Sequence, residues 1–203
     1  MSAFKAVIFD MGGVLIRFLD PLAFDRFLEV INADKEKRKR FMDVEKGEKV
    51  LTDALDVYSI VYPDLKDVED FEGASLEDFS GQKNTDMLEI VRRLKAHGFK
   101  VGLLTNNFFW SNARKRSAVI KEADEFDAVV ESCRVGFRKP ERHIFEIMAE
   151  KLGVQLKECV FIDDWEKNVQ GARAAGLAGI FLPHDNTTSA IRELESLLGV
   201  SLH

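Results

Sequence analysis

The sequence is short of several features that mark other classes of protein. Its 203 residues include two cysteines, Cys133 and Cys159. Two are too few for a disulfide framework, and they lack the paired spacing of a zinc site, so we expect both to be small buried side chains. The chain has only 4 prolines and 13 glycines, beside 46% hydrophobic and 32% charged residues. This composition excludes collagen-like, low-complexity and disordered chains and predicts a globular protein.

Long apolar runs and an excess of positive charge are absent too. The most apolar early stretch, residues 6–16, is interrupted by Asp10 and is shorter than the roughly 18 residues that cross a bilayer. Lys and Arg number 29 against 35 Asp and Glu, a net charge of -6, which gives phosphate backbones no general attraction. An apparent strand begins where a secretory signal would lie. We therefore expect a cytoplasmic protein with no membrane span and no nucleic-acid partner.

Five short apolar segments have the character of buried strands. They are residues 6–9, 100–104, 128–131, 159–162 and 178–182. Continuous apolar runs of this length are typical of parallel strands covered by helices on both faces. Amphipathic stretches with helical spacing lie between the later segments. This alternation predicts an α/β fold with a doubly wound, Rossmann-like parallel sheet, in which ligands bind at the carboxyl ends of the strands.

One long stretch without a predicted strand separates the first strand from the others. Its apolar residues recur at helical spacing, for example at Phe27 and Ile31. We predict a small α-helical domain over residues 17–83, inserted into a core domain formed by residues 1–16 and 84–203. Because the insert leaves just after the first strand, we expect it to lie over that strand's carboxyl end, where a ligand would bind.

Two segments place polar groups at the ends of the first two predicted strands. In FDMGGVL, Asp10 ends the strand, and Gly12 and Gly13 permit a tight turn and a close approach of the backbone to a ligand. In LLTNN, Thr105 and Asn106 bring a hydroxyl and an amide that can donate to an anion. Taken alone, each segment is equally consistent with an ordinary capped strand end or an Asx turn.

Two further segments add a cation and a pair of acids. In GFRKP, Lys139 precedes a proline that should begin a helix, which fixes the direction of the lysine. In FIDDWEKN, Asp163 and Asp164 follow a strand, and Asn168 lies one helical turn later. Adjacent carboxylates near Asp10 repel one another unless a cation compensates them, and Mg²⁺ suits such oxygen ligands. Helix N-capping is the alternative, and it explains one acid better than two.

The four segments in this order resemble the four motifs of the haloacid dehalogenase-like (HAD) hydrolase superfamily. The helical insert resembles the cap of subfamily I, at the superfamily's first insertion position. The segments LLTNNF, FDAVVESCRVGFRKP and FIDDWEKNVQGARAAGL are similar to the phosphatase-like domains at the N-termini of soluble epoxide hydrolase and of an acyl-CoA dehydrogenase family member. In the insert, VEKGEKVLTDAL resembles a cap loop of many relatives.

The resemblance implies hydrolysis of a small phosphorylated molecule through an aspartyl-phosphate at Asp10. It implies that Mg²⁺ bridges Asp10, the carbonyl of Gly12 and Asp164. Asp163 would lie in the outer shell of the ion, and Asn168 would support the metal side of the site. The ion would also neutralise the crowded acids.

The same resemblance implies how the phosphate is held. Thr105 and the amide of Asn106 would bind phosphoryl oxygens, and Lys139 would keep the nucleophile ionised and offset charge. Gly12 and Gly13 would let the backbone approach the substrate. Positioning and electrostatics of this kind supply most of the rate of phosphoryl transfer.

One position departs from the superfamily's pattern. Most of its phosphatases carry a second Asp two residues after the nucleophile as general acid and base, where this chain has Gly12. General acid–base catalysis contributes roughly 10²- to 10⁴-fold. We therefore expect slow turnover, or a restriction to esters with good leaving groups, such as aryl, acyl or anomeric phosphates. An acid from the cap could take over this role, and Glu45 and Glu48 are the candidates.

Two other functions stay open. Dehalogenating relatives also lack the second Asp, but they work without metal, which leaves the pair Asp163 and Asp164 without a purpose. A catalytically weak domain that binds a phosphorylated ligand or a protein partner is the other alternative, and Gly12 favours it. The retained nucleophile argues against it, because a binding module has no need of one.

Overall fold

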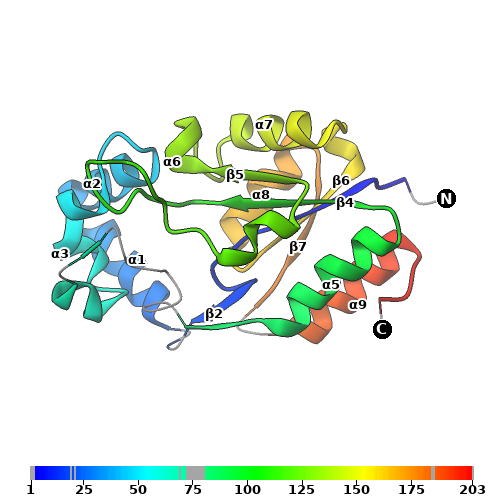
Figure 1. Ribbon diagram of the computed structural model, residues 1–203, viewed down its shortest axis with the longest axis horizontal. Coiled ribbons are helices and arrows are strands. Elements are labelled where there is room, and N and C mark those ends of the chain that lie inside the picture. The colour runs from blue at the N-terminus through cyan, green and yellow to red at the C-terminus, as the bar shows by residue number, and fades with distance from the viewer. Residues whose placement is uncertain are drawn as a thin grey trace.

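A five-stranded parallel sheet in the order β5-β4-β1-β6-β7 organises the chain (Figure 1). The computed structural model describes residues 3–18, 20, 22–68, 70–71, 81–183 and 186–202. The strands are β1 (Ala6–Phe9), β4 (Lys100–Thr105), β5 (Ala128–Glu131), β6 (Cys159–Asp163) and β7 (Ala178–Phe181). No strand differs by more than one residue from its predicted bounds. The α/β fold with a parallel sheet is confirmed.

The central strand β1 sends alternate side chains to two separate cores. Val7 and Phe9 belong to one apolar cluster, and Ala6 and Ile8 belong to the other, with all four side chains fully buried. Such a strand must be apolar at every position, because successive side chains point to opposite faces of the sheet. This explains why the sequence signal was a continuous apolar run.

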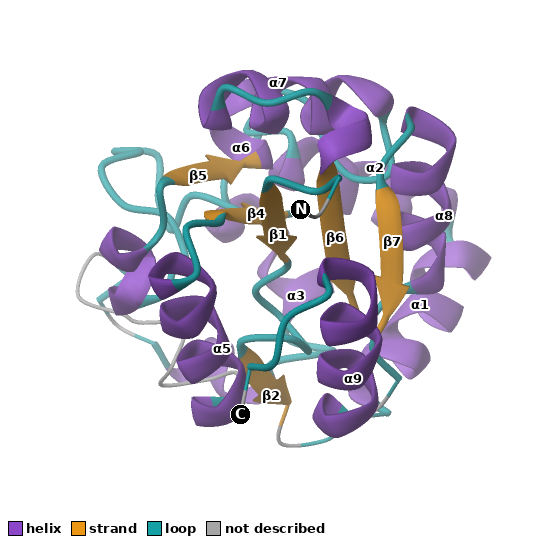
Figure 2. Ribbon diagram, turned by 90° about the vertical axis from the view of Figure 1, so that its right-hand side faces the viewer, coloured by secondary structure: helices purple, strands orange, loops and turns teal. Residues whose placement is uncertain are grey.

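Helices cover both faces of the sheet, as Figure 2 shows. On one face lie α5 (Thr85–Ala96) and α9 (Thr187–Leu198), and on the other lie α7 (Arg142–Leu152) and α8 (Glu166–Ala175). A single turn of helix, α6 (Ser132–Val135), follows β5. The buried side chains of α5 and α7 recur at the three- and four-residue spacing of an amphipathic helix.

The insert is helical and lies at one end of the sheet, on the left of Figure 1. Its elements are α1 (Ala23–Ala33), α2 (Lys35–Glu45), α3 (Leu55–Tyr58) and two short 3-10 helices, Leu51–Ala54 and Pro63–Asp67. Asp34 begins α2 by accepting hydrogen bonds from the backbone N–H groups of Glu36 and Lys37. The insert has an aromatic interior, in which the rings of Phe27 and Phe41 lie 5.0 Å apart, edge to face.

The expectation that residues 17–82 contain no strand is wrong at both ends of the insert. Strands β2 (Ile16–Phe18) and β3 (Gly81–Lys83) pair as a two-stranded antiparallel ribbon. Three residues are too few to show an alternating pattern, and the two strands pair only with each other, so neither carries a sequence signal. The predicted domain bound at 16/17 falls within β2, and the bound at 83/84 falls at the end of β3. The division itself stays a prediction.

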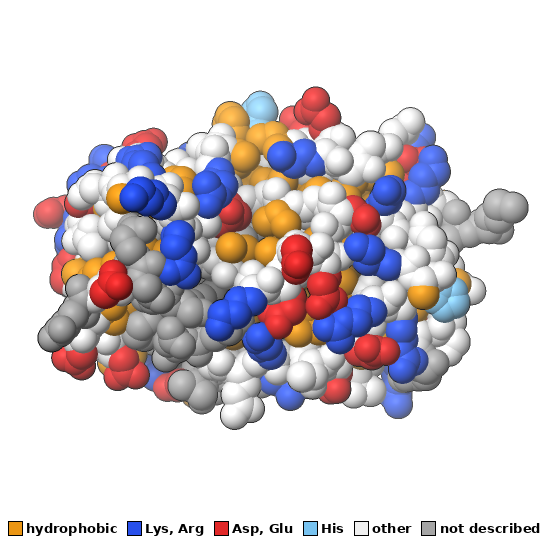
Figure 3. All heavy atoms as spheres, in the orientation of Figure 1, with side chains coloured by type: hydrophobic (Ala, Val, Ile, Leu, Met, Phe, Trp, Pro, Cys, Tyr) orange, Lys and Arg blue, Asp and Glu red, His pale blue; other side chains and the backbone are white. Residues whose placement is uncertain are grey.

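Three simpler expectations concern exposure. Cys133 and Cys159 are free and buried, as expected. In the described part of the chain, every helix is too short or too polar to cross a membrane. On the face drawn in Figure 3, basic and acidic side chains are interspersed, in keeping with the modest net charge.

A buried asparagine connects the end of the insert to the core. Asn84 directly follows β3 and is fully buried. Its side-chain oxygen accepts from the backbone N–H of Met87 in the first turn of α5, which caps that helix. Its Nδ2 donates to the carbonyl oxygen of Val14 at 2.9 Å and to Oγ1 of Thr187 in α9 at 3.0 Å. One side chain thus joins the loop after β1, α5 and α9.

We expect Asn84→Ala to destabilise the protein by about 3 kcal/mol, because it removes a helix cap and leaves the partners of the amide unpaired in the interior. Urea unfolding measures this change. Asn186→Ala is the matched control: Asn186 caps α9 through one hydrogen bond at an exposed site, and its loss should cost about 1 kcal/mol. Equal losses in the two variants would contradict the linking role of Asn84.

Candidate active site

A buried lysine joins two strand ends at the centre of the site. Asp10 follows β1, and Asp163 ends β6, which pairs with β1 in parallel. Nζ of Lys139 lies 2.6 Å from Oδ1 of Asp10 and 2.7 Å from Oδ2 of Asp163. The lysine side chain is 1% exposed. The two motifs that supply the acids are therefore brought together by one ammonium group.

A third carboxylate, Asp164, joins the two that contact the ammonium. Ligand oxygens of Asp10, Asp163 and Asp164 lie within 4.8 Å of one another. Burial raises the pKa of Asp10 to about 7, with the charge of Asp163 adding to the rise and Lys139 opposing it. Burial and the same neighbouring acids also raise the pKa of Asp164 well above its ordinary value. Three acids beside one ammonium therefore resist full ionisation unless a further cation compensates them.

The charge of Lys139 is held by its partners. Burial disfavours the ammonium form, but the attraction of Asp10 and Asp163 together outweighs it, so the pKa of Lys139 is raised. An ammonium in this place keeps a neighbouring carboxylate ionised and able to act as a nucleophile.

The loop after β4 positions Lys139 as well as offering groups to a ligand. Asn106 accepts a hydrogen bond from the backbone N–H of Lys139 at 2.8 Å and donates from Nδ2 to its carbonyl oxygen at 3.1 Å. The side chain of Asn106 is thus occupied in holding the lysine segment. Thr105 is 2% exposed and lines the same cavity as Asp10, so its hydroxyl lies at the wall of that cavity.

The two glycines after Asp10 have different roles. Gly13 has a φ of +72°, and its N–H donates to the carbonyl oxygen of Ile16 within the turn. A Cβ at Gly13 would lie 1.9 Å from Oδ2 of Asp164, so only glycine lets that carboxylate take its place. Gly13 is buried and does not line the cavity, whereas Gly12 does.

Asp163 is fully engaged by the protein. Its oxygens accept from Lys139, from the backbone N–H of Trp165 at 2.8 Å, and from Nδ2 of Asn168 at 3.1 and 3.2 Å. Asn168 is 3% exposed, and its Oδ1 has no hydrogen-bond partner among the described residues. A buried acceptor left in this state indicates a position for a donor or a metal-bound water.

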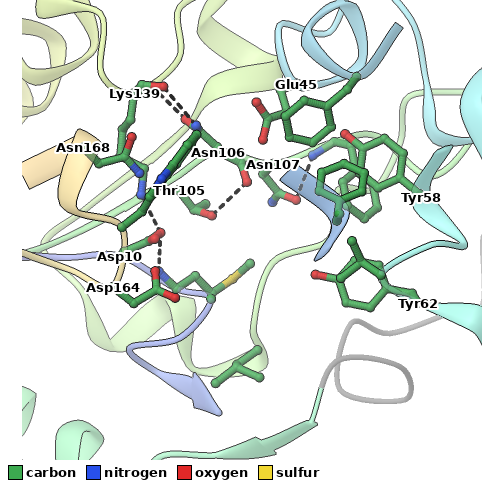
Figure 4. A pocket seen from close by; sticks show the side chains of 18 residues that line it. Asp10, Glu45, Tyr58, Tyr62, Thr105, Asn106, Asn107, Lys139, Asp164 and Asn168 are labelled. Atoms are coloured by element: carbon green, nitrogen blue, oxygen red, sulfur yellow. Dashed lines mark hydrogen bonds and ion pairs between the residues drawn. The ribbon is translucent and has the colours of Figure 1, made fainter. Parts of the chain in front are cut away.

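The acids face a cavity with about 820 Å³ of space free of atoms, part of it open to solvent. The core contributes Asp10, Gly12, Thr105, Asn106, Lys139, Asp164 and Asn168, and the insert contributes Phe27, Phe41, Glu45, Tyr58, Val61 and Tyr62. Figure 4 shows the insert side chains across the cavity from Asp10 and Asp164. The insert therefore lies over the carboxyl ends of the strands, as predicted.

The two candidate cap acids lie in different places. Glu45, at the end of α2, is buried in the cavity wall, and its carboxylate accepts from Nε of Arg138 at 2.5 Å. Burial raises the pKa of Glu45, and Arg138 opposes the rise. Glu48 is exposed and lines a shallow hollow with Lys35 and Arg38, away from the acids. The structure does not bring Glu48 to the site.

Sequence reasoning missed two residues of this region. Arg138 joins the insert to the core through Glu45, and its guanidinium lies 5.6 Å from the ring centre of Phe41. Asn107, which lines the cavity, donates to Glu131 at 2.7 Å and is 1% exposed. The available signal was their position in the sequence. Arg138 directly precedes Lys139, and Asn107 directly follows Asn106, so both could have been placed near the site.

Comparisons with known proteins define the class. The family model of the haloacid dehalogenase-like hydrolases matches residues 4–176. The chain belongs to this family.

Particular relatives carry further names. The chain is 36% identical over 58% of its length to acyl-CoA dehydrogenase family member 10 of Mus musculus, of which the match covers 11%. It is 36% identical over 59% of its length to bifunctional epoxide hydrolase 2 of Sus scrofa, with 22% covered. It is 37% identical over 54% of its length to Phosphatase MT3486 of Mycobacterium tuberculosis, with 50% covered. The chain thus spans half or less of each of these three relatives.

A solved structure shares the fold. A HAD family enzyme from Bacteroides thetaiotaomicron, in complex with magnesium and inorganic phosphate, aligns with a TM-score of 0.62 at 23% identity. The alignment covers 90% of this chain and 96% of that one. The resemblance to the HAD superfamily and to the two named N-terminal domains is confirmed.

We expect Lys139→Met to destabilise the metal-free protein by about 3 kcal/mol, because it leaves buried carboxylates without their cation. Urea unfolding in the presence of a chelator measures this loss. Lys5→Met is the control, since Lys5 forms an ion pair with Glu158 at the surface and exposed pairs contribute little. A loss at Lys139 no greater than the loss at Lys5 would show that the buried cation is not required.

Proposed function

We propose that this chain is a Mg²⁺-dependent phosphatase that hydrolyses a small phosphomonoester through a phosphorylated Asp10. The observation that carries the proposal is the meeting of Asp10, Lys139 and the acid pair at the mouth of one cavity. A nucleophile beside a fixed ammonium, with excess carboxylate to hold a divalent cation, suits attack on a phosphoryl group.

The residues present fit a magnesium ion. The donors are hard carboxylate oxygens, and the charge of three acids exceeds that of Lys139. Asp10, the carbonyl of Gly12 and Asp164 would hold the ion, with Asp163 behind them, since protein donors already occupy its oxygens. When bound, the ion would polarise the phosphoryl group and neutralise charge.

The chain's own residues account for the two chemical steps. An oxygen of Asp10 would form a bond to phosphorus as the bond from phosphorus to the ester oxygen breaks, and the ester oxygen would leave with the electron pair. Water would then form a bond to phosphorus as the bond between phosphorus and the Asp10 oxygen breaks. The electron pair of that bond returns to the Asp10 carboxylate, and the protons of the water leave with inorganic phosphate or pass to solvent. Thr105 and the backbone N–H of Asn106 would bind phosphoryl oxygens during both steps. Lys139 would hold Asp10 ionised, and Asn168 would position Asp163.

The departure of the leaving group is the step that this site assists least. Gly12 offers no acid where a proton is needed, so good leaving groups should be favoured. Glu45 is the cap acid that reaches the cavity, and its raised pKa is in the direction that a proton donor requires. Its ion pair with Arg138 opposes that rise. We therefore infer restricted turnover. The cytoplasmic location and the absence of a nucleic-acid partner stay predictions from the sequence.

The first test is turnover of p-nitrophenyl phosphate with Mg²⁺. We expect Asp10→Asn to abolish it, because the amide cannot attack phosphorus. Asp124→Asn is the control, since Asp124 is exposed and does not line the cavity, and it should retain full activity.

Thermal melting supplies a second readout for the metal. We expect Mg²⁺ to raise the melting temperature of the wild type and of Asp124→Asn, and to raise that of Asp164→Asn much less, because a ligand is lost. Turnover that persists in Asp10→Asn, or that is unaffected by a chelator, would rule out the proposal.

A second test restores the missing acid. The backbone φ at Gly12 is not positive, so the backbone conformation itself does not require glycine there. We expect Gly12→Asp to increase turnover of an alkyl phosphate about tenfold or more, and to change turnover of p-nitrophenyl phosphate far less, because only the poor leaving group needs a proton. Gly12→Asn is the matched control without an acid. Equal gains in the two variants would show that Gly12 does not limit the reaction.

A further inference from the structure

The wall of the cavity opposite the acids is aromatic. It is formed by five aromatic side chains and one valine, which come from α1, α2, α3, the turn that follows α3 and the loop after β4. These residues are Phe27, Phe41, Tyr58, Val61, Tyr62 and Phe108. Figure 4 shows the rings of Tyr58 and Tyr62 across the cavity from Asp10, Asp164 and Asn168. Whatever group is attached to a phosphate at Asp10 would therefore extend toward these rings.

The rings already pack on one another in a continuous series. Phe41 and Tyr58 have ring centres 5.6 Å apart, and Tyr58 and Phe108 have theirs 5.0 Å apart with planes at 66°. Phe108 in turn lies 5.2 Å from Trp110, at 90°. A wall of edge-to-face rings offers a planar ring the same kind of contact, beyond the burial of its apolar surface.

Three polar side chains of the cavity, those of Glu45, Asn106 and Asn107, are already occupied by other groups of the protein. The Glu45 carboxylate is paired with Arg138. The side chain of Asn106 is bonded on both sides to the Lys139 backbone. The side chain of Asn107 donates to Glu131 and accepts from the N–H of Phe108. Recognition of a sugar requires groups that hydrogen-bond its hydroxyls, and these side chains have little left to offer.

The two tyrosine hydroxyls of the wall differ from these groups. Oη of Tyr58 is buried and has no hydrogen-bond partner among the described residues, and Tyr62 brings a second hydroxyl to the cavity. Two hydroxyls among apolar rings can orient a substituent, but they are too few to recognise a polyol. The wall thus favours an apolar ring over a sugar or a small charged acyl group.

We propose that the substrate is an aryl phosphate, the phosphate ester of a phenol whose ring binds to the aromatic wall. This inference rests on the proposed phosphatase activity and selects among the three classes of good leaving group. A phenol has a pKa of about 10, so its oxygen can leave as the phenolate, with the electron pair of the broken phosphorus–oxygen bond, without an acid at Gly12. The missing acid and the aromatic wall thus point to the same chemical class.

Four esters test this with the wild-type chain and Mg²⁺. Phenyl phosphate and 1-naphthyl phosphate both release a phenol but differ in apolar area, so their ratio isolates binding to the wall. Glucose 1-phosphate supplies an anomeric leaving group on a polar body. Acetyl phosphate is too small to reach the wall and reports on the phosphoryl chemistry alone. We expect kcat/KM for 1-naphthyl phosphate to exceed the phenyl and glucose values by about tenfold or more.

A pair of charge variants places the effect in the cavity. Val61→Asp introduces a carboxylate into the wall, and we expect it to lower kcat/KM for 1-naphthyl phosphate about tenfold or more. It should change acetyl phosphate hydrolysis less than about threefold, which also shows that the variant is folded. Val30→Asp is the matched control, because Val30 is an exposed residue of the same insert and does not line the cavity. It should alter neither rate.

The outcomes separate the two proposals. Turnover of acetyl phosphate with no preference for the naphthyl ester over phenyl phosphate or glucose 1-phosphate would overturn the aryl assignment and leave the phosphatase standing. Equal effects of Val61→Asp on the naphthyl and acetyl esters would overturn it as well. Absence of turnover of all four esters would refute the phosphatase itself, and the aryl assignment with it.

Discussion

The salt bridge from Lys139 to Asp10 and Asp163 is the interaction on which the site depends. Without both carboxylates, an ammonium group that is almost wholly buried would lose its proton and become neutral. Asp10, whose side chain is also largely buried, is in turn kept ionised by the ammonium, which lowers its pKa against the effect of burial. Because β1 and β6 are adjacent and parallel, the sheet delivers the two acids to one edge. The lysine is then fixed by Asn106 from the end of β4, so three strands specify one charged centre.

The site has three carboxylates beside one ammonium group, and this excess of acids determines which ligand it can bind. No ammonium partner of Asp164 is found among the described residues, and its place exists because Gly13 lacks a side chain. A cation beside these acids would balance the charge of Asp164. The protein therefore keeps a locally unfavourable arrangement that ligand binding would stabilise, as is common at functional sites.

The sheet and the charged centre were predictable from sequence for a common reason. Strands buried on both faces are continuously apolar, and the residues that end them must meet at one edge, so Asp10, Thr105 and Asp163 could be placed together without coordinates. The cap was harder. Helical spacing identified apolar faces that include Phe27, but it could not tell a face that packs in a core from one that lines a cavity. The pairing of Glu45 with Arg138 was not predicted. It joins the end of α2 in the insert to the segment before α7 in the core, and no sequence pattern indicates that these two segments lie together.

The ribbon of β2 and β3 has a mechanical consequence. The two covalent connections between the insert and the sheet run side by side and are hydrogen-bonded to each other, and Asn84 clamps their root to α5 and α9. Two separate tethers would allow the insert to slide or tilt independently at each crossing. A paired ribbon permits mainly twisting and bending about one axis. Ligand entry and product release would therefore depend on motion at the same hinge.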